Sequence, residues 1–303
     1  MRVFLTGGTG FVGSHMLPRL ARENHIIRML ARDPARAAAA VPDAIKAQVE
    51  IAAGDVVTGS GLQAAVEGCD AVIHLVGIIM EVGGATFEKS HHQATRNVLA
   101  AAQNSATVRR FVQMSALGAR ENGVSAYQIT KWKAEEAVRS GGIPFVILRP
   151  SIIFGPRDGF VNQMVQVMRT APLIRPVPGH GRYPFRPIYV DNVVDCFVQS
   201  LSNDAALGKT IELVGPEALT LEQMLAEIAR CIGVKKPALK VPFPIMYMNA
   251  AIMGLVLPRP PVTTDQLRML REGSTADPAP MMATFKVDLV GFRQGLKKYL
   301  CKA

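Results

Sequence analysis

Residues 6–14 read Thr6-Gly7-Gly8-Thr9-Gly10-Phe11-Val12-Gly13-Ser14, and they follow directly on the apolar run Val3-Phe4-Leu5. The apolar run predicts a buried strand, and the amphipathic segment 11–22 predicts a helix. A strand that turns at once into a helix leaves free backbone N–H groups at the positive end of the helix dipole, where a pyrophosphate fits well. The stretch therefore predicts a dinucleotide-binding turn.

Each glycine of this turn has its own expected task. Gly7 and Gly8 allow the tight turn, Gly10 leaves the backbone open to the phosphates, and Gly13 lets the helix pack closely on the strand. An ordinary turn between strand and helix is the alternative, but such a turn seldom needs four glycines. We expect the turn to contact the dinucleotide through Gly7, Gly10, Phe11, Val12 and Gly13.

The size and charge of the chain limit what it can bind. Its 303 residues can bury a large core, and its net charge of +10 indicates an anionic partner such as a phosphorylated cofactor, an acidic membrane surface or a nucleic acid. Lysines and arginines are scattered rather than interleaved with aromatic residues, which argues against nucleic acid. The first predicted strand stands at the start of the chain and leaves no room for a targeting peptide, so we expect a cytoplasmic protein.

The cysteines also indicate a cytosolic protein. They lie far apart and without metal-ligand spacing, so they predict reduced thiols in a cytosolic setting and no metal site; they are Cys69, Cys196, Cys231 and Cys301.

Strand-like and helix-like segments alternate over the first half of the chain. Apolar strands are predicted, with helices between them, at residues 26–30, 49–53, 71–76, 111–114 and 145–148. This alternation is typical of an α/β fold with a doubly wound parallel sheet, which binds its ligands at the carboxyl ends of the strands. We expect a Rossmann domain over residues 1–155 and a small α+β cap over residues 156–303 that is interleaved with it.

The end of the second predicted strand indicates which nicotinamide cofactor is bound. An acidic residue there favours a free ribose 2′-hydroxyl, and an arginine favours a 2′-phosphate. Asp33 is followed by Pro34 and an alanine-rich run, a pattern typical of a helix N-cap. Arg32, with help from Arg36, is therefore free to pair with a phosphate, and NADP(H) is favoured over NAD(H).

The ends of the next two strands supply further expected contacts. Asp55, which precedes Val56, could accept a hydrogen bond from the adenine amino group, or it could instead cap the helix that starts near Ser60. Gly77, which follows Val76, lets the backbone approach the cofactor closely.

Tyr127 and Lys131 carry the predicted chemistry. They are four residues apart on a helix predicted to run to about Arg139, so they share one face. An ammonium beside a phenol stabilises the phenolate and lowers the pKa of the phenol, so Tyr127 could exchange a proton with a carbonyl or an alcohol. Lys131 could also hold the nicotinamide ribose. For this spacing alone, an amphipathic surface turn is the alternative.

Together these motifs resemble a known family. The chain is similar to the extended and atypical short-chain dehydrogenases/reductases, a family that includes NAD-dependent epimerases and dehydratases, through the phosphate turn, Gly54-Asp55-Val56, Tyr127-x-x-x-Lys131, Leu148-Arg149-Pro150 and Gly155-Pro156. Residues 74–79, 114–119, 151–156 and 185–191 more narrowly resemble the branch of the nucleotide-binding accessory subunit of respiratory complex I and its bacterial relatives. That branch implies tight NADPH binding, often without demonstrated turnover.

The resemblance also implies roles for single residues. It makes Tyr127 the acid/base and Lys131 the ribose ligand, and it assigns further cofactor contacts to Gly7, Gly10, Gly13, Arg32, Asp55, Pro150, Ile152 and Ile153. Ala116 stands where extended members usually carry a hydroxyl residue, so either Ser115 reaches the substrate or the third catalytic hydroxyl is missing. His91 takes the place of an asparagine that supports the lysine, and a buried structural histidine is the alternative.

Three functions stay open at this point. The first is an NADP(H)-dependent oxidoreductase that acts on an apolar carbonyl or quinone-like (ubiquinone-type) compound in a hydrophobic cap. The second is a non-catalytic module whose dinucleotide is structural and which docks on a membrane respiratory or quinone-handling assembly. The third is a nucleotide-sugar epimerase or dehydratase, whose phosphate ligands would be Arg157, Arg182 and Arg186, although a solvated basic rim is the preferred interpretation of these arginines.

Residues 243–257 indicate how the protein could meet a membrane. The stretch is nearly free of charge but too short for a crossing of about 20 residues. An apolar helix with basic flanks can lie in a membrane interface, and the flanks here hold Lys235, Lys236, Lys240 and Arg259. A buried helix of the cap is the favoured interpretation, and peripheral association with the inner membrane is the alternative.

Overall fold

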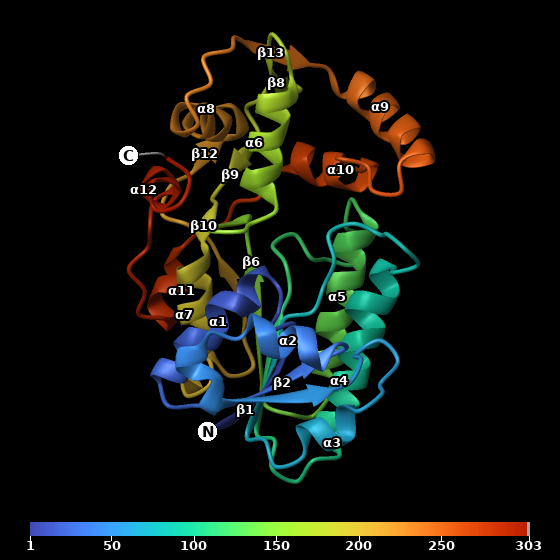
Figure 1. The fold of residues 1–303 in the computed structure, drawn as a ribbon, viewed down its shortest axis with the longest axis vertical. Coiled ribbons are helices and arrows are strands. Elements are labelled where there is room, and N and C mark those ends of the chain that lie inside the picture. Colours follow the sequence, from blue (N-terminus) through green and yellow to red (C-terminus); the bar gives the residue numbers. More distant parts are fainter. Residues whose placement is uncertain (302–303) are drawn as a thin grey trace.

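A central sheet of seven parallel strands organises the molecule. The computed structural model describes residues 1–301, and its sheet has the order β11-β6-β5-β4-β1-β2-β3 (Figure 1). The strands are β1 (Arg2–Thr6), β2 (Ile26–Ala31), β3 (Val49–Ala53), β4 (Ala71–His74), β5 (Arg110–Met114), β6 (Phe145–Pro150) and β11 (Thr210–Leu213). The order reverses at β1, which is the topological switch point where such sheets bind nucleotides. The predicted doubly wound fold is confirmed.

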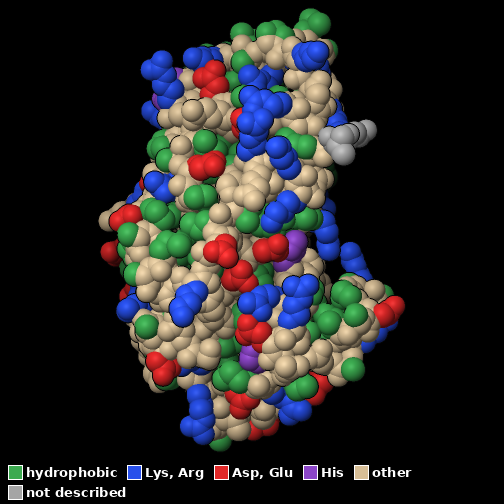
Figure 2. Space-filling view, turned by 90° about the vertical axis from the view of Figure 1, so that its left-hand side faces the viewer, with side chains coloured by type: hydrophobic (Ala, Val, Ile, Leu, Met, Phe, Trp, Pro, Cys, Tyr) green, Lys and Arg blue, Asp and Glu red, His purple; other side chains and the backbone are tan. Residues whose placement is uncertain are grey.

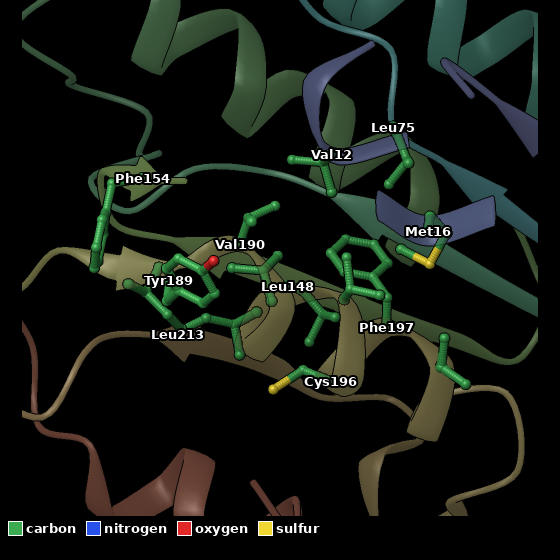
Figure 3. Close-up of a cluster of buried hydrophobic side chains, with 14 of the residues drawn as sticks. Val12, Met16, Leu75, Leu148, Phe154, Tyr189, Val190, Cys196, Phe197 and Leu213 are labelled. Carbon is green, nitrogen blue, oxygen red and sulfur yellow. The ribbon is translucent and has the colours of Figure 1, made fainter. Parts of the chain in front are cut away.

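Two helical layers cover the sheet (Figure 1). One layer consists of α1 (Phe11–Arg22), α2 (Pro34–Ala40) and α7 (Val190–Gln199), and the other consists of α3 (Leu62–Val66), α4 (Ala94–Gln103) and α5 (Ala126–Arg139). Figure 3 shows part of the core under the first layer, where Met16 of α1, Leu148 of β6 and Phe197 of α7 lie together. Because both faces are covered, the strands are mostly apolar, as is typical of parallel strands.

One predicted helix has an irregular start. The helix between β4 and β5 is α4, and a π-helical turn at Glu88–Gln93 precedes it; a short 3₁₀ turn at Asp43–Gln48 precedes β3. A π-helical turn is wider than an α-helical one and is frequent at functional sites. Here the turn contains His91, which is buried.

The cap lies beyond the carboxyl ends of the strands (Figure 1). Its short strands pair as β7 (Ile153–Phe154) with β10 (Ile188–Tyr189), β9 (Pro184–Phe185) with β12 (Leu219–Thr220), and β8 (Arg175–Pro178) with β13 (Ala238–Val241). Its helices are α6 (Phe160–Thr170), α8 (Leu221–Cys231), α9 (Phe243–Val256) and α10 (Thr264–Glu272). The chain then returns toward the sheet through α11 (Ala279–Thr284) and α12 (Phe292–Lys297).

Two of the cysteines correct the sequence-based expectation. Cys69 and Cys196 are buried free thiols, as predicted, but Cys231 and Cys301 form a disulfide across 70 residues of chain. Cys231 ends α8, and α12 packs against α8, which carries Cys301 to it. Local sequence patterns do not reveal such a meeting between distant segments.

Helix α9 also differs from the expectation. The favoured interpretation was a buried cap helix, but only Phe243 and Ala250 of its residues are buried, and Leu255 and Val256 are 89% and 74% exposed. The helix packs on α10 along one side only, and its other side faces outward. Along residues 1–301, every helix is too short or too polar to span a bilayer.

Candidate functional site

The glycine turn after β1 needs glycine at two of its positions, Gly7 and Gly13, as the sequence predicts. Gly7 has a φ of +77°, a conformation that glycine adopts at no steric cost. A Cβ at Gly13 would lie 2.2 Å from the Gly7 carbonyl oxygen, so only glycine lets α1 approach the turn this closely. Gly10 is exposed, and a Cβ there would meet only the Gly7 oxygen at 3.2 Å. The backbone at Gly10 is therefore open to an incoming phosphate.

Gly8 has a different task from the one expected. It is not held in a positive-φ conformation; instead, a Cβ at this position would lie 2.3 Å from the Met29 sulfur of β2. Gly8 therefore makes room for the core rather than for the turn. Of the first two residues of α1, Val12 is buried and Phe11 is half-buried.

At the end of β2, the acid and the bases take separate positions. The Asp33 carboxylate accepts a hydrogen bond from the Arg36 backbone N–H at 3.0 Å, so Asp33 is the N-cap of α2, as predicted. The side chains of Arg32 and Arg36 are exposed. The arginines are thus available at the position where a ribose 2′-substituent lies in this fold.

The Asp55 side chain is engaged by its own loop rather than by the helix that follows. Its carboxylate accepts a hydrogen bond from the Val57 backbone N–H at 2.7 Å, and α3 begins later, with Gly61 as its N-cap. The proposed cap of the helix near Ser60 is therefore wrong. Asp55 remains half-buried beside the buried Val56, and its contact with adenine stays a prediction.

Lys131 is buried under the loop that follows β4. Its ammonium donates a hydrogen bond to the Met114 carbonyl oxygen at 3.1 Å, and a Cβ at Gly77 would lie 2.9 Å from the same nitrogen. Gly77 is exposed and Val76 is half-buried. Burial lowers the pKa of Lys131 to about 8, although the nearby Glu135 carboxylate favours the protonated form.

Tyr127 lies one turn earlier on α5 and is half-buried. Its ring packs edge-on against Phe87 and His91, with ring centroids 5.8 Å and 5.2 Å away. Burial raises the pKa of Tyr127 to about 12. The expected lowering of this pKa by Lys131 is therefore wrong for the protein by itself, because the Lys131 ammonium is directed to the Met114 carbonyl.

Ser115 does not offer a free hydroxyl. It is buried, and its Oγ donates to a Glu135 carboxylate oxygen at 2.5 Å. Glu135 also accepts hydrogen bonds from Arg149 at 2.6 and 2.7 Å and from Arg139 at 2.7 Å. Burial disfavours the charged form of Arg149, but its contact with the Glu135 carboxylate raises its pKa. Ala116, which follows Ser115, is buried. The suggestion that Ser115 reaches the substrate is not supported by this arrangement.

His91 serves the structure of the site. Its Nδ1 lies 2.9 Å from the Thr130 hydroxyl, which itself donates to the Ala126 carbonyl, and its Nε2 lies 3.1 Å from the Ile78 backbone nitrogen. The same Nε2 lies 2.9 Å from the Ile78 carbonyl oxygen, so both ring nitrogens of His91 are engaged within the protein. Burial lowers the pKa of His91 to about 2. The buried structural histidine, the alternative offered for this position, fits these contacts.

A row of buried polar side chains continues across the sheet beneath this site. Thr6, His74 and Gln113 are aligned on β1, β4 and β5, and the Thr6 hydroxyl lies 2.6 Å from the His74 Nδ1. Burial lowers the pKa of His74 to about 3, and the positive charge of Lys131 acts in the same direction. Sequence reasoning missed Gln113; the signal was a polar residue placed inside an otherwise apolar strand.

The loop after β6 holds the last of the predicted cofactor contacts. The Pro150 carbonyl accepts from the Leu117 N–H at 2.9 Å, which joins this loop to the one after β5. Ile152 and Ile153 are half-buried. These residues therefore stand at the carboxyl edge of the sheet, where the predicted contacts of β1 and β4 also end.

The three arginines considered as phosphate ligands have different surroundings. Arg157, with a φ of +73°, shares a surface depression with Gly8, Thr9 and Ser14, beside the glycine turn. Arg186 donates to the Pro216 carbonyl at 3.3 Å, and Arg182 is exposed.

Comparisons with known proteins agree with this geometry. A family model described as NAD(P)H-binding matches residues 7–166, more than half of the chain. The chain is 29% identical to "NADH dehydrogenase (ubiquinone) 1 alpha subcomplex subunit 9, mitochondrial" of Arabidopsis thaliana over 81% of this chain, but it spans only 61% of that relative's length. It is also 29% identical to a ceramide reductase of Caulobacter vibrioides, over 83% of this chain and 77% of the relative.

Solved structures show the same fold. The chain resembles the UDP-glucuronic acid 4-epimerase of Bacillus cereus in complex with UDP-glucuronic acid and NAD, with a TM-score of 0.74, 17% identity and coverage of 98% of this chain and 97% of that one. At this identity the likeness concerns the fold alone. With the family match over the glycine turn and the sheet, the chain belongs to the NAD(P)H-binding family, as its resemblance to the accessory subunit of respiratory complex I implies.

Proposed function

We propose that this protein is an NADP(H)-dependent reductase of an apolar carbonyl compound. The observation that carries the proposal is the placement of Tyr127 and Lys131 on consecutive turns of α5, with Lys131 under the Gly77 loop at the edge of the sheet where the glycine turn also lies. An acid/base group beside a dinucleotide-binding turn is the arrangement that hydride transfer to a carbonyl needs.

The residues present fit a nicotinamide dinucleotide. Gly10 leaves an exposed backbone at the start of α1, and Gly77 leaves space that any side chain would fill. Gly10 and Gly13 would hold the pyrophosphate, Lys131 the nicotinamide ribose, and Asp55 the adenine. When bound, the cofactor supplies the hydride.

The proton comes from the chain itself. Tyr127 is protonated at neutral pH, since burial raises its pKa to about 12, so its phenol can donate to the carbonyl oxygen as negative charge develops there. A protonated Lys131 beside it would favour the resulting phenolate. For this, the Lys131 ammonium must leave the Met114 carbonyl oxygen and turn toward the cofactor ribose and Tyr127. We therefore expect the cofactor to bind before the proton is transferred.

The substrate is proposed to be apolar. Ile78, Ile152 and Ile153 are half-buried and Ile79 is 50% exposed, so the loops after β4 and β6 offer aliphatic surface at the carboxyl edge of the sheet. The relative named ceramide reductase supports the same class, because a ceramide is a lipid. A quinone-like carbonyl compound fits the same surface.

The test of this proposal is turnover. NADPH consumption is measured against a panel of long-chain ketones, keto-lipids and quinones for the wild type, Tyr127→Phe and the control Tyr247→Phe, a tyrosine of α9. We expect one class of compound to be reduced, with a loss of at least about a hundredfold in Tyr127→Phe alone. Equal rates for the wild type and Tyr127→Phe, or no turnover with any compound, would refute it.

The preference for NADP(H) over NAD(H) is a part of the proposal. Asp33 is engaged as a helix cap, whereas Arg32 and Arg36 are exposed at the ribose end of β2. We expect NADPH to bind more tightly than NADH in a calorimetric titration, and Arg32→Ala to remove most of that difference because it removes a charge-assisted contact with the 2′-phosphate. Arg22→Ala, an exposed arginine at the end of α1, is the control. A wild type without preference would contradict the assignment.

A second candidate function is a non-catalytic module that keeps its dinucleotide permanently, docked on a membrane respiratory or quinone-handling assembly. The specific observation in its favour is the engagement of the Ser115 hydroxyl with Glu135 beside the apolar Ala116, which leaves the third catalytic hydroxyl missing. Mass spectrometry of the nucleotide that co-purifies distinguishes the two. A stoichiometric nucleotide that survives dialysis and is not consumed supports the module.

A nucleotide-sugar epimerase or dehydratase is the remaining alternative. It would require several cations around one diphosphate, whereas Arg157 lies beside the glycine turn and Arg186 binds carbonyls of the cap. Isothermal titration with UDP-sugars tests it, and micromolar binding would favour this alternative over the reductase.

A further inference from the structure

Helix α9 presents an uncovered apolar face. Ile245, Met248, Ile252 and Leu255 follow one another at intervals of three or four residues, which places them along one side of the helix, and each is exposed. A helix that is hydrophobic on all sides is normally buried, and contiguous exposed apolar surface normally marks a binding site. A partner is therefore expected to cover this face.

The inner side of α9 is fixed to the protein. Phe243 and Ala250 pack with Leu267 of α10, and Tyr183 and Tyr247 lie against this small cluster. The uncovered face thus has a defined direction, because the opposite face is held in place.

The length of α9 restricts how it could meet a bilayer. Its 14 residues, none of them charged, span about 21 Å at 1.5 Å per residue, against about 30 Å for a hydrocarbon core. The helix therefore cannot cross a membrane, but it can lie in the plane of its surface.

The charges around α9 indicate which kind of partner fits. Residues 228–264 contain no aspartate or glutamate, whereas Lys235, Lys240 and Arg259 are exposed on either side of the helix. Lys236 is used inside the protein, where it donates to the Met168 carbonyl at 2.9 Å near the end of α6. Figure 2 shows the side of the molecule away from α9, where lysines and arginines gather over the upper part, which the cap forms; these belong to another face than α9.

These charges favour a lipid surface over a second copy of the chain. Two copies joined through α9 would bring the same basic flanks together, and like charges across an interface cost affinity. An anionic headgroup layer attracts them instead, and each lysine or arginine near such a surface strengthens binding.

We propose that α9 docks this protein on an anionic lipid bilayer, with the helix lying flat in the headgroup region and Ile245, Ile252 and Leu255 directed into the acyl chains. The docked helix also orients the candidate site. On α10, which packs against α9, Asp265 accepts from the Ala126 N–H at 3.2 Å and Glu272 accepts from the Gln128 amide at 2.6 Å. Docking therefore places the Tyr127 end of α5 near the membrane, and, resting on the proposed reductase function, an apolar substrate would arrive from the lipid.

The experiment is vesicle flotation of the full chain. The vesicles consist of phosphatidylcholine alone or of phosphatidylcholine with an equal part of phosphatidylglycerol. We expect the wild type to float with the anionic vesicles at low salt, and less with neutral vesicles or at high salt. The double variant Ile252→Ser, Leu255→Ser should lose at least about tenfold in partitioning. Lys235→Ala and Lys240→Ala should each lose about fivefold. Met282→Ser, which changes an exposed methionine on α11, should bind as the wild type.

Several results would overturn the docking proposal. One is equal flotation of the wild type and the Ile252, Leu255 double variant, and another is no flotation at low salt. A dimer of the wild type that this double variant converts to a monomer would show that a second copy covers α9. The charge variants test the same proposal should the apolar variant fail to fold. NADPH titration of each variant keeps docking separate from the proposed reductase, because docking can fail while nucleotide binding and turnover persist.

Discussion

At the scale of the residue, burial sets the charge state of Lys131. In the protein by itself the pKa of this lysine is lowered to about 8 because its ammonium is removed from water. The unfolded chain keeps the ordinary value near 10.4, so the unfolded state binds the proton more strongly between these two values. This part of the stability of the fold is therefore regained as pH rises from about 8 toward 10.

Nucleotide affinity should follow the opposite course. Because the proposed ribose contact needs the ammonium form, we expect the dissociation constant of NADPH to increase by up to about tenfold per pH unit above pH 8. Fluorescence titration from pH 7 to 9.5 measures it. Lys131→Met should bind more weakly and without this pH dependence, whereas Lys133→Met, two residues along α5, should keep it. A flat profile for the wild type would remove Lys131 from the cofactor site.

The two buried histidines make a second residue-scale prediction. Burial lowers the pKa of His74 to about 3 and that of His91 to about 2, whereas an unfolded histidine titrates near 6.5. The unfolded state then takes up protons first, so the free energy of unfolding should fall by about 1.4 kcal/mol per pH unit for each histidine as pH drops from 6.5 to 5.

Urea denaturation at a series of pH values checks this slope. His74→Gln should reduce the slope by about one histidine's share, and substitution of the exposed His180 by Gln should leave it unchanged. A wild type whose stability is the same at pH 6.5 and pH 5 would contradict the burial of these two rings.

At the scale of the element, two glycines of the turn should differ in what their substitution disturbs: one the fold and nucleotide binding, the other nucleotide binding alone. Gly13→Ala would place a Cβ 2.2 Å from the Gly7 oxygen, so we expect a loss of about 1–3 kcal/mol of stability together with nucleotide binding. Gly10→Val should keep the fold, since a Cβ there meets only one atom at 3.2 Å, yet weaken NADPH binding at least tenfold because its methyls stand over the exposed backbone.

Urea unfolding and NADPH titration of the two glycine variants give both readouts. Normal nucleotide affinity in Gly10→Val would mean that the phosphates do not lie against the start of α1.

Elements whose determinants are local were predictable from the sequence. Helix α1 runs from Phe11 to Arg22, as its apolar periodicity predicted, and Asp33 caps α2. The features that failed depend on distant partners. Ser115 is held by Glu135, which in turn requires Arg149 from another strand, and no spacing in the sequence reveals that three-way contact. The exposure of α9 likewise reflects what does not pack on it.

At the scale of the whole molecule, the cap and the nucleotide-binding part share one core. Strand β11 and helix α7 both come from beyond residue 155, yet β11 pairs with β6 and α7 packs on α1. The proposed division at residues 155 and 156 is thus a division of roles, because the sheet and its covering layer need both parts.

Truncation tests this shared core. A fragment of residues 1–155 would uncover the face of α1 that carries Met16 and Leu20, so we expect it to lack a cooperative thermal transition and to bind a hydrophobic dye, unlike the full chain. Circular dichroism and dye fluorescence measure both. A sharp transition in the fragment would show that residues 1–155 fold independently.

The contact between Gly77 and Lys131 has a consequence for substitutions at position 77. The Lys131 ammonium occupies a small space between the loop after β4 and α5, and this space is free because residue 77 has no side chain. A larger residue at 77 would have to push the flexible end of the Lys131 side chain aside, so substitution at this position should change where the ammonium lies before it disturbs the fold.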